Sequence, residues 1–275
     1  MQSRLLHIFR NTPLGRETLL QSVYFCKKVN LVLTIYIPEF TKFLMYFENE
    51  VVQVDLDRSY LTSPDTALMN ASTTVEQGGL EAEFLEPKDF PASTLPALPT
   101  NFDYMSCPRS ISDRSSRIGF GHIGPKVRRL VNSAGFPILM PSSAYKEWHS
   151  VAVFFGGSAN AVNALRLGLK ISTTCNMPMD IFTQVENDLR DICEEATKES
   201  GLEREVKNSV REWHRFEKET FCDNLYKVPH DALVVLGAYG RGPIKQICLG
   251  SQTERIRCTI PNNFLVVGPR YLETT

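Results

Sequence analysis

The chain has 275 residues, of which 43% are hydrophobic and 22% charged, and its formal net charge is -1. This length suits two domains of about 100–150 residues, and the composition is that of an ordinary globular protein. A charge so near zero gives no field of one sign to attract nucleic acid or an anionic membrane. No apolar stretch approaches the roughly 18 residues of a membrane span, and the N-terminus is too polar for a signal peptide. We therefore expect a cytoplasmic protein without nucleic-acid or membrane partners.

The seven cysteines are widely spaced and form no C-x-x-C pair. This pattern is typical of free thiols in a reducing compartment and argues against a zinc site or a disulfide framework. The five histidines are scattered, and no paired carboxylates suit general acid–base work. The sequence therefore predicts no catalytic residue and no metal site.

In the first half, an apolar strand over 5–9 precedes a helix pattern. Two short apolar runs on either side of Glu48-Asn-Glu50 predict a hairpin, within an insertion of about 38–66. Proline, serine and threonine over 92–100 predict an exposed loop. The last elements predicted for this half are a strand over 102–106, a helix beginning at 124 and a strand over 136–140.

The second half alternates strands with helices, and 202–212 fits either a strand or a continued helix. The predicted strands are 151–155, 181–185, 232–236 and 264–268, and the predicted helices are 159–171, 188–199, 214–227 and 251–258. Such alternation of short apolar strands with helices predicts a mainly parallel, doubly wound sheet.

The two halves correspond to each other at four places in the same order: the first strand, the strand near the middle, a helix beginning after a glycine, and a last strand that ends at a proline. This agreement predicts a duplicated domain. We place the domains at 1–143 and 149–275, with a short polar link between them.

A glycine-rich segment follows the strand 232–236. It contains Gly237, Gly240 and Gly250, with Ser251 at the start of the next predicted helix. Glycines allow the backbone to approach an anion, and a helix N-terminus offers unpaired N–H groups and a partial positive charge. The segment therefore predicts a phosphate site at the carboxyl edge of the sheet, where doubly wound folds bind ligands. A tight turn with a simple capping box is the structural alternative.

The spacing Gly237-x2-Gly240-x9-Gly250-Ser251 resembles, without a gap, the nucleotide-binding signature of the universal stress proteins. The resemblance covers 149–275 well and 1–141 more weakly, so the chain is similar to tandem universal stress proteins. It implies an α/β fold of two tandem Rossmann-like domains, of the adenine nucleotide alpha hydrolase-like kind. Each would have a five-stranded parallel sheet of order 3-2-1-4-5 with helices on both faces.

The resemblance also implies which residues bind an adenine nucleotide. The glycines of the loop and Ser251 would surround the phosphates, the backbone of Val185 would recognise adenine, and Leu236 would pack near the sugar or base. The implied nucleotide-binding residues are Val185, Leu236, Gly237, Gly240, Gly250, Ser251 and Gln252, and less directly Gly156, Gly157, Ser158 and Arg241.

Two departures from the family pattern bear on the site. Gly156 stands where binders usually carry an aspartate that contacts the ribose or a metal, which argues against a Mg²⁺ requirement. The first half has lost the signature: Met105–Ser110 replaces the first glycine pair, Pro125 replaces Ser251, and Arg10 stands at the position of the acid. We expect this half to be a structural or regulatory partner.

The predicted function is a stress-response or regulatory protein that binds ATP, ADP or AMP in its second domain and is not an enzyme, or at most a slow ATPase. The alternative is an interaction or scaffold protein with a vestigial loop. An enzyme acting on another phosphorylated small molecule would need a catalytic residue from the hairpin near 43–56. Pairing through the last strands predicts an intramolecular pseudo-dimer, with a homodimer as the other arrangement.

Overall fold

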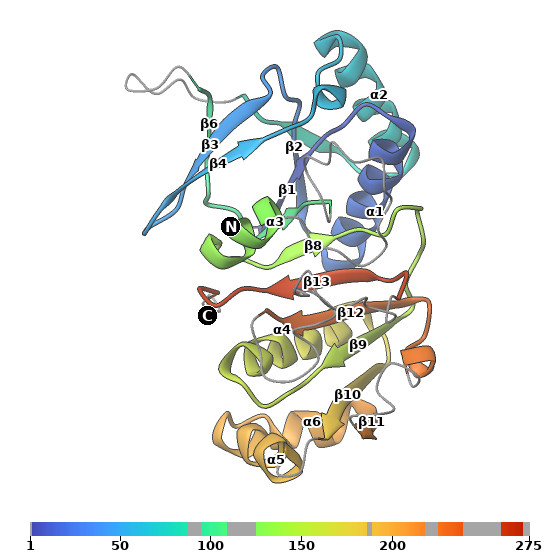
Figure 1. The fold of residues 1–275 in the computed structure, drawn as a ribbon. Coiled ribbons are helices and arrows are strands. Elements are labelled where there is room, and N and C mark those ends of the chain that lie inside the picture. Colours follow the sequence, from blue (N-terminus) through green and yellow to red (C-terminus); the bar gives the residue numbers. More distant parts are fainter. Residues whose placement is uncertain are drawn as a thin grey trace. The chain divides into compact units, whose positions relative to one another are not determined.

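The computed structural model describes residues 2–86, 95–108, 125–185, 189–217, 225–238 and 260–271. The described residues form two compact units, unit 1 up to Glu147 and unit 2 from Trp148. Figure 1 labels their helices and strands.

Unit 1 contains one parallel sheet, one small second sheet and three α-helices among its described residues. Its elements are β1 (Arg4–Ile8), α1 (Pro13–Val29), β2 (Val32–Tyr36), β3 (Lys42–Tyr46), β4 (Val51–Asp55), the 3₁₀ turn η1 (Arg58–Tyr60), α2 (Pro64–Gln77), β5 (Ala82–Phe84), β6 (Ala97–Leu98), β7 (Tyr104–Ser106), α3 (Pro125–Ser133) and β8 (Ile138–Met140).

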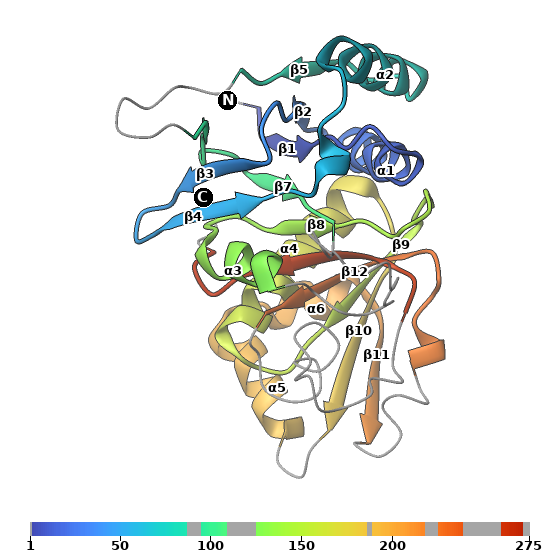
Figure 2. The same cartoon turned by 45° about the horizontal axis from the view of Figure 1, so that its top comes forward.

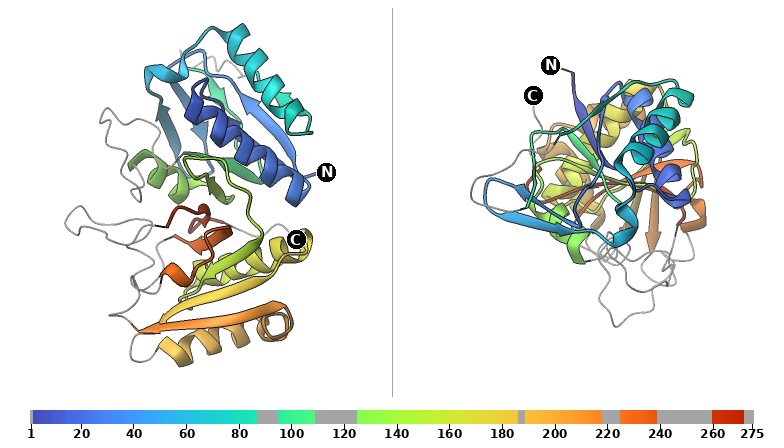
Figure 3. Two further views of the ribbon diagram at one scale, coloured as in Figure 1. Left: turned by 90° about the vertical axis from the view of Figure 1, so that its right-hand side faces the viewer. Right: turned by 90° about the horizontal axis from the view of Figure 1, so that it is seen from above.

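The parallel sheet of unit 1 has the order β5-β2-β1-β7-β8, which Figure 2 shows from its top downward. Counted along the chain, this is 3-2-1-4-5. Right-handed crossovers place α1 and α2 on one face of this sheet and α3 on the other, because the connections run in opposite directions from β1. The helices α1 and α2 pack side by side, as the blue and cyan helices of Figure 3 show.

The inserted segment of unit 1 forms its own sheet. Strands β3 and β4 pair antiparallel as a hairpin, and β6 joins β3 in parallel. Side chains alternate along the hairpin, with Phe43 and Met45 buried on β3 and Val52 and Val54 buried on β4. The exposed loop predicted over 92–100 is therefore wrong at Ala97 and Leu98, because these two residues bury apolar side chains in β6. Residues 87–94 lie outside the described part of the chain.

Unit 2 repeats the same architecture. Its elements are β9 (Ser150–Phe154), α4 (Ala159–Cys175), β10 (Met179–Val185), α5 (Leu189–Glu199), α6 (Glu203–Ser209), β11 (Val210–Glu217), the 3₁₀ turn η3 (Leu225–Lys227), β12 (Ala232–Gly237) and β13 (Asn263–Val267). The parallel order β11-β10-β9-β12-β13 is again 3-2-1-4-5. The predicted fold class is confirmed in both units.

The first helices of the two units have equal lengths and matching caps. Each has 17 residues; α1 begins after Thr12 and α4 after Ser158, whose hydroxyls accept backbone N–H bonds of the first turn. Each ends at an asparagine in the left-handed conformation, Asn30 with φ 60° and Asn176 with φ 51°. This agreement supports the duplication on structural grounds.

The predicted helix 214–227 is wrong at 214–217, which belong to the edge strand β11 (Val210–Glu217), and at 225–227, which form the 3₁₀ turn η3; residues 218–224 lie outside the described part of the chain. The ambiguous stretch 202–212 divides between α6 and the start of this strand. Apolar and polar residues do not alternate along β11, and both of its faces carry charged residues, which hides the strand pattern. His214, expected at a helix start, instead stacks on Phe182 with ring centroids 4.6 Å apart.

Within the described part of the chain, none of the helices is both long and apolar enough to span a membrane.

Candidate functional site

Three neighbouring strands of unit 2 end at one edge of its sheet. The order is β10-β9-β12, and it reverses between β9 and β12. Val185 is the last residue of β10, Gly237 is the last of β12, and Gly156 follows β9 by two residues. The structure therefore brings these three predicted residues to the reversal point, where doubly wound sheets bind ligands.

Gly237 lies against the first turn of α4. A Cβ atom added at Gly237 would be 2.5 Å from the carbonyl carbon and oxygen of Asn160 and 2.8 Å from the nitrogen of Ala161. The Asn160 amide donates a 2.7 Å hydrogen bond to the carbonyl of Ala238. The end of β12 is thus joined to the N-terminus of α4, and only glycine fits between them.

The connection from β9 to α4 is also shaped by glycine. Gly157 has φ +69°, and a Cβ added there would be 3.0 Å from Cγ2 of Ile192 in α5. Ser158 caps α4 by accepting a 3.3 Å hydrogen bond from the nitrogen of Ala161. Gly157 and Ser158 therefore hold the turn and the helix start beside the strand ends, and the structure gives Ser158 a capping role.

At the end of β10, the backbone of Val185 pairs on one side among the described residues. Pairing with β9 ends at Phe182, whereas pairing with β11 continues to Val185 and Glu217. On the other side of the strand, none of the described residues pairs with the backbone of Val185, so this side can accept a further partner. Such an edge suits recognition of a planar base by backbone groups, which is the role that the family resemblance implies.

Gln184 is a candidate that the sequence did not single out. Its side chain is 5% exposed, and its Oε1 has no hydrogen-bond partner among the described residues. Thr183 bonds to Cys193 of α5, so Gln184 points to the opposite face of β10. A buried amide oxygen without a partner is costly, and one beside a candidate ligand edge suggests a ligand contact. In the sequence, the indication that Gln184 belongs to the site was its position directly before Val185.

Of the other predicted residues, Leu236 is fully buried within β12 and pairs in register with Phe154 and Val266. Leu236 therefore lies inside the sheet, directly before the edge at which these strands end. The remaining predicted site residues, Gly240, Arg241, Gly250, Ser251 and Gln252, lie outside the described residues.

A buried polar chain fixes the end of β9. The nitrogen of Phe155 bonds to the carbonyl of Phe182 at 2.9 Å, and the Thr183 hydroxyl donates to the carbonyl of Phe155 at 2.9 Å. The Trp213 indole in turn donates to the Thr183 hydroxyl at 2.9 Å. Burial raises the pKa of the neighbouring Cys193 thiol to about 11, and bonding to Thr183 offsets this only in part. This thiol is neutral near pH 7 and is no nucleophile.

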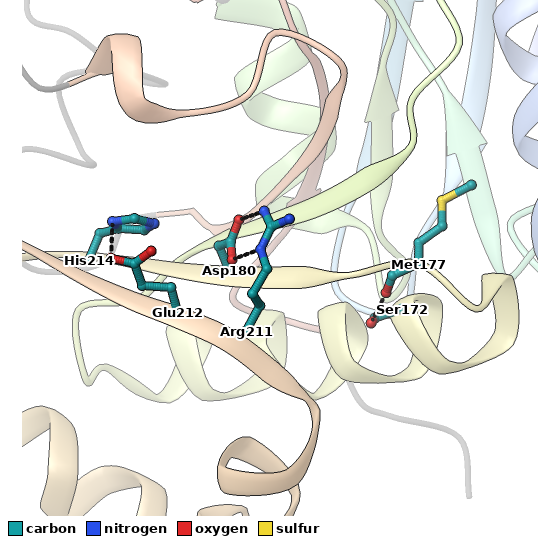
Figure 4. A network of polar contacts seen from close by, with 6 residues as sticks. All are labelled: Ser172, Met177, Asp180, Arg211, Glu212 and His214. Atoms are coloured by element: carbon teal, nitrogen blue, oxygen red, sulfur yellow. Dashed lines mark hydrogen bonds and ion pairs between the residues drawn. The ribbon is translucent and has the colours of Figure 1, made fainter.

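Figure 4 shows two ion pairs of β10 and β11, of which Asp180–Arg211 lies at the start of these strands, away from the edge. Arg211 makes two hydrogen bonds to the buried carboxylate of Asp180, one of 2.9 Å from Nε, and His214 pairs with Glu212 at 3.3 Å. Asp180 precedes Val185 by five residues, about 16 Å along a strand. The Asp180–Arg211 pair sits at an irregularity between Met179 and Asp180, where it satisfies a buried charge.

No cluster of three or more potential metal-ligating side chains occurs in the part of the chain that the structure describes. The described cysteines, Cys26, Cys107, Cys175 and Cys193, form no disulfide with one another.

The corresponding edge of unit 1 carries larger side chains. Met105 and Ser106 lie in the buried strand β7, and Cys107 follows directly as a fully buried residue. Arg10 stands two residues after β1, as Gly156 does after β9. Here the guanidinium of Arg10 lies 3.4 Å from the Asp57 carboxylate and over the ring of Tyr60.

Comparison with solved structures shows the fold of the universal stress proteins over nearly the whole chain. A universal stress protein from Archaeoglobus fulgidus DSM 4304 superimposes with a TM-score of 0.62 at 14% identity, covering 97% of this chain and 98% of its own. A Pseudomonas aeruginosa UCBPP-PA14 protein assigned to the same group gives a TM-score of 0.56 at 10% identity, with 98% and 94% covered. No family model and no curated protein matches the sequence.

The same fold also occurs in another setting. The cytoplasmic domain of a prokaryotic cation chloride cotransporter gives a TM-score of 0.50 at 8% identity, covering 97% of this chain and 95% of its own. The chain therefore has the tandem universal stress protein fold, as the sequence predicted. Function must be argued from its strand-end residues, because one fold serves unrelated functions.

Proposed function

We propose that the chain is a tandem universal stress protein whose C-terminal domain binds an adenine nucleotide and has a regulatory role. The carrying observation is the position of the signature: Gly237-x2-Gly240-x9-Gly250-Ser251 begins at the last residue of β12, beside the reversal of strand order. A chance match to this glycine spacing would not be expected to begin at the strand end where doubly wound folds bind ligands.

The binding mode follows from the residues at the edge. The glycine segment would offer backbone N–H groups to the phosphates, and the helix predicted from Ser251 would add its N-terminal partial charge. The open backbone edge of Val185 would recognise adenine, and the amide of Gln184 would bond to the sugar or base. Gly156 offers no carboxylate, so we propose binding that does not depend on Mg²⁺.

We propose little or no turnover. Phosphoryl transfer needs a group that positions the nucleophile and charges that stabilise the transferring phosphate. The glycines, Val185 and Gln184 of the proposed site include no general base, and the carboxylate residue Glu217 ends the edge strand β11. The bound or empty state, rather than a product, would carry the signal. Pairing of the two domains within one chain, as the family resemblance implies, is part of the same proposal.

The test is direct. The purified protein is extracted for bound small molecules and titrated calorimetrically with ATP, ADP and AMP, with and without Mg²⁺. Gly240→Val, which would obstruct the phosphate, and Ser251→Ala, which removes a hydroxyl, are expected to weaken binding at least about tenfold. The matched control is Ser143→Ala, an exposed serine of the link, which is expected to bind as wild type does.

Gln184→Leu separates ligand binding from folding. Leucine is of similar size and removes the buried Oε1 that has no partner among the described residues, so we expect stability to change little, whereas a ligand contact would be lost. Retained nucleotide affinity in this variant would remove Gln184 from the site. Absence of nucleotide from the wild-type protein, in extracts and titrations alike, would favour the scaffold alternative.

A further inference from the structure

The strand edge of unit 1 has its own point of order reversal, between β1 and β7. Two residues mark it: Arg10, just beyond β1, and Cys107, which continues the ladder of β7 through a 2.8 Å bond from its nitrogen to the carbonyl of Leu139. In a doubly wound fold this is the place for a ligand. In this unit a segment of the chain itself reaches the same place.

That segment is the turn η1, which follows the hairpin. Asp57 caps it, accepting a 2.8 Å bond from the nitrogen of Ser59, and the same carboxylate pairs with Arg10 at 3.4 Å. The guanidinium carbon of Arg10 lies 5.3 Å from the ring centroid of Tyr60, within the range of a cation–π contact. Tyr60 is only 3% exposed.

Tyr60 and Cys107 are neighbours in this packing. Burial raises the pKa of the Tyr60 phenol, and the Cys107 thiol raises it further. Burial alone raises the pKa of Cys107, which is fully enclosed. The buried Tyr60 ring, which lies under Arg10, and the buried Cys107 thiol therefore interact at this edge.

The hairpin that delivers the turn is fixed to the rest of unit 1. Lys126 of α3 forms a 2.7 Å ion pair with Asp55, at the end of β4, and Arg129 lies 3.6 Å from Glu50 at the start of the same strand. The turn begins three residues after Asp55. It is thus held near the edge by the strand before it as well as by its own contacts.

We propose that the Asp57–Tyr60 turn is a built-in occupant of the unit 1 ligand crevice, closed by Tyr60 under Arg10 and held by the Arg10–Asp57 pair. The turn that follows the inserted hairpin would then fill the crevice in which a ligand would otherwise bind, and this edge of unit 1 would have a structural role. This proposal stands on unit 1 alone and does not depend on nucleotide binding in unit 2.

The experiment uses Cys107 as a reporter in the full chain. Native protein is alkylated with iodoacetamide, and the labelled fraction of each cysteine is followed in time by peptide mass spectrometry. Wild-type Cys107 is expected to stay protected, as Cys26 does, because Cys26 is also fully buried in unit 1. Tyr60→Ala is expected to speed Cys107 labelling at least about tenfold, with Cys26 still protected, because it removes the ring that closes the edge.

Two further variants keep the test decisive if Tyr60→Ala unfolds the unit and exposes Cys26 as well. Asp57→Ala and Arg10→Ala remove the ion pair and leave the ring, and each is expected to speed Cys107 labelling several-fold. The matched control is Tyr46→Ala, a tyrosine of the same hairpin that is 37% exposed, which is expected to leave Cys107 protected. Rapid labelling of wild-type Cys107, or unchanged protection in all three variants, would overturn the proposal.

Discussion

At the scale of single residues, a buried histidine sets the response of unit 1 to acid. His7 lies in β1 with 2% of its surface exposed, and its Nδ1 is 2.9 Å from the Ser22 hydroxyl, which bonds in turn to Ser106 at 2.8 Å. Its Nε2 has no partner among the described residues. Burial lowers the pKa of His7 from 6.5 to about 3. The folded protein therefore keeps this ring neutral at pH values where the unfolded chain protonates it.

We predict a loss of stability between pH 6.5 and 5 that depends on His7. The unfolded state binds the proton and the folded state does not, so stability falls as pH falls below 6.5, by about 1.4 kcal/mol per pH unit or about 2 kcal/mol over this range. Denaturant unfolding at several pH values measures it. On acidification from pH 6.5 to 5, His7→Gln is expected to lose about 2 kcal/mol less stability than wild type. His149→Gln, a substitution of an exposed histidine, is expected to lose as much stability as wild type does. Equal slopes in all three proteins would show that His7 is accessible to protons in the folded state.

At the scale of elements, the contact between β12 and α4 positions the candidate site. Both the close approach of Gly237 and the bond from Asn160 to Ala238 act across it. The ligand edge of unit 2 therefore depends on how two segments far apart in the sequence are packed.

We predict that Gly237→Ala destabilises the protein by about 2 kcal/mol or more, because the new methyl group would meet backbone atoms that cannot move without shifting the helix. Thermal or denaturant unfolding measures this cost. The comparison variant is Gly201→Ala: its Cβ would meet nothing within 4 Å, although its φ of +71° is strained. That variant is expected to cost about 1 kcal/mol. A smaller cost at Gly237 than at Gly201 would mean that the β12–α4 contact can relax.

Strands made of short apolar runs were predictable, including the last strands β8 and β13, and the polar edge strand β11 was not. Strands such as Ser150–Phe154 and Ala232–Gly237 are apolar runs bounded by turn residues, and their predicted limits differ by one residue. Edge strand β11 carries polar groups on both faces and was predicted partly as a helix. Among the site residues, the glycine spacing identifies Gly237 from the sequence alone. Gln184 and Tyr60 can be identified only from their burial and from the pairing of segments that are far apart in the sequence.

At the scale of the whole molecule, the two units share a fold and differ at the ligand edge. Unit 2 has Gly156 and Gly237 there, and unit 1 has Arg10 and Tyr60. The two proposals together give one functional crevice for each chain.

We predict a stoichiometry of one adenine nucleotide per chain in calorimetric titration of the 275-residue chain. We expect this value because unit 2 carries the glycine signature, whereas the crevice of unit 1 is closed by the Asp57–Tyr60 turn. Gly240→Val is expected to weaken the single binding event at least about tenfold, and Tyr60→Ala is expected to leave it unchanged. A stoichiometry near two would contradict the closure of unit 1.

The matching first helices of the two units have a consequence for ancestry. α1 and α4 keep the same length, a hydroxyl residue before the first turn and an asparagine after the last, while the ligand edges have diverged. The two units thus keep the same length of helix between their first two strands, while the residues at the strand ends differ. A search for further copies of this domain would therefore use the helix length and its two end residues as well as the glycine signature, which unit 1 lacks.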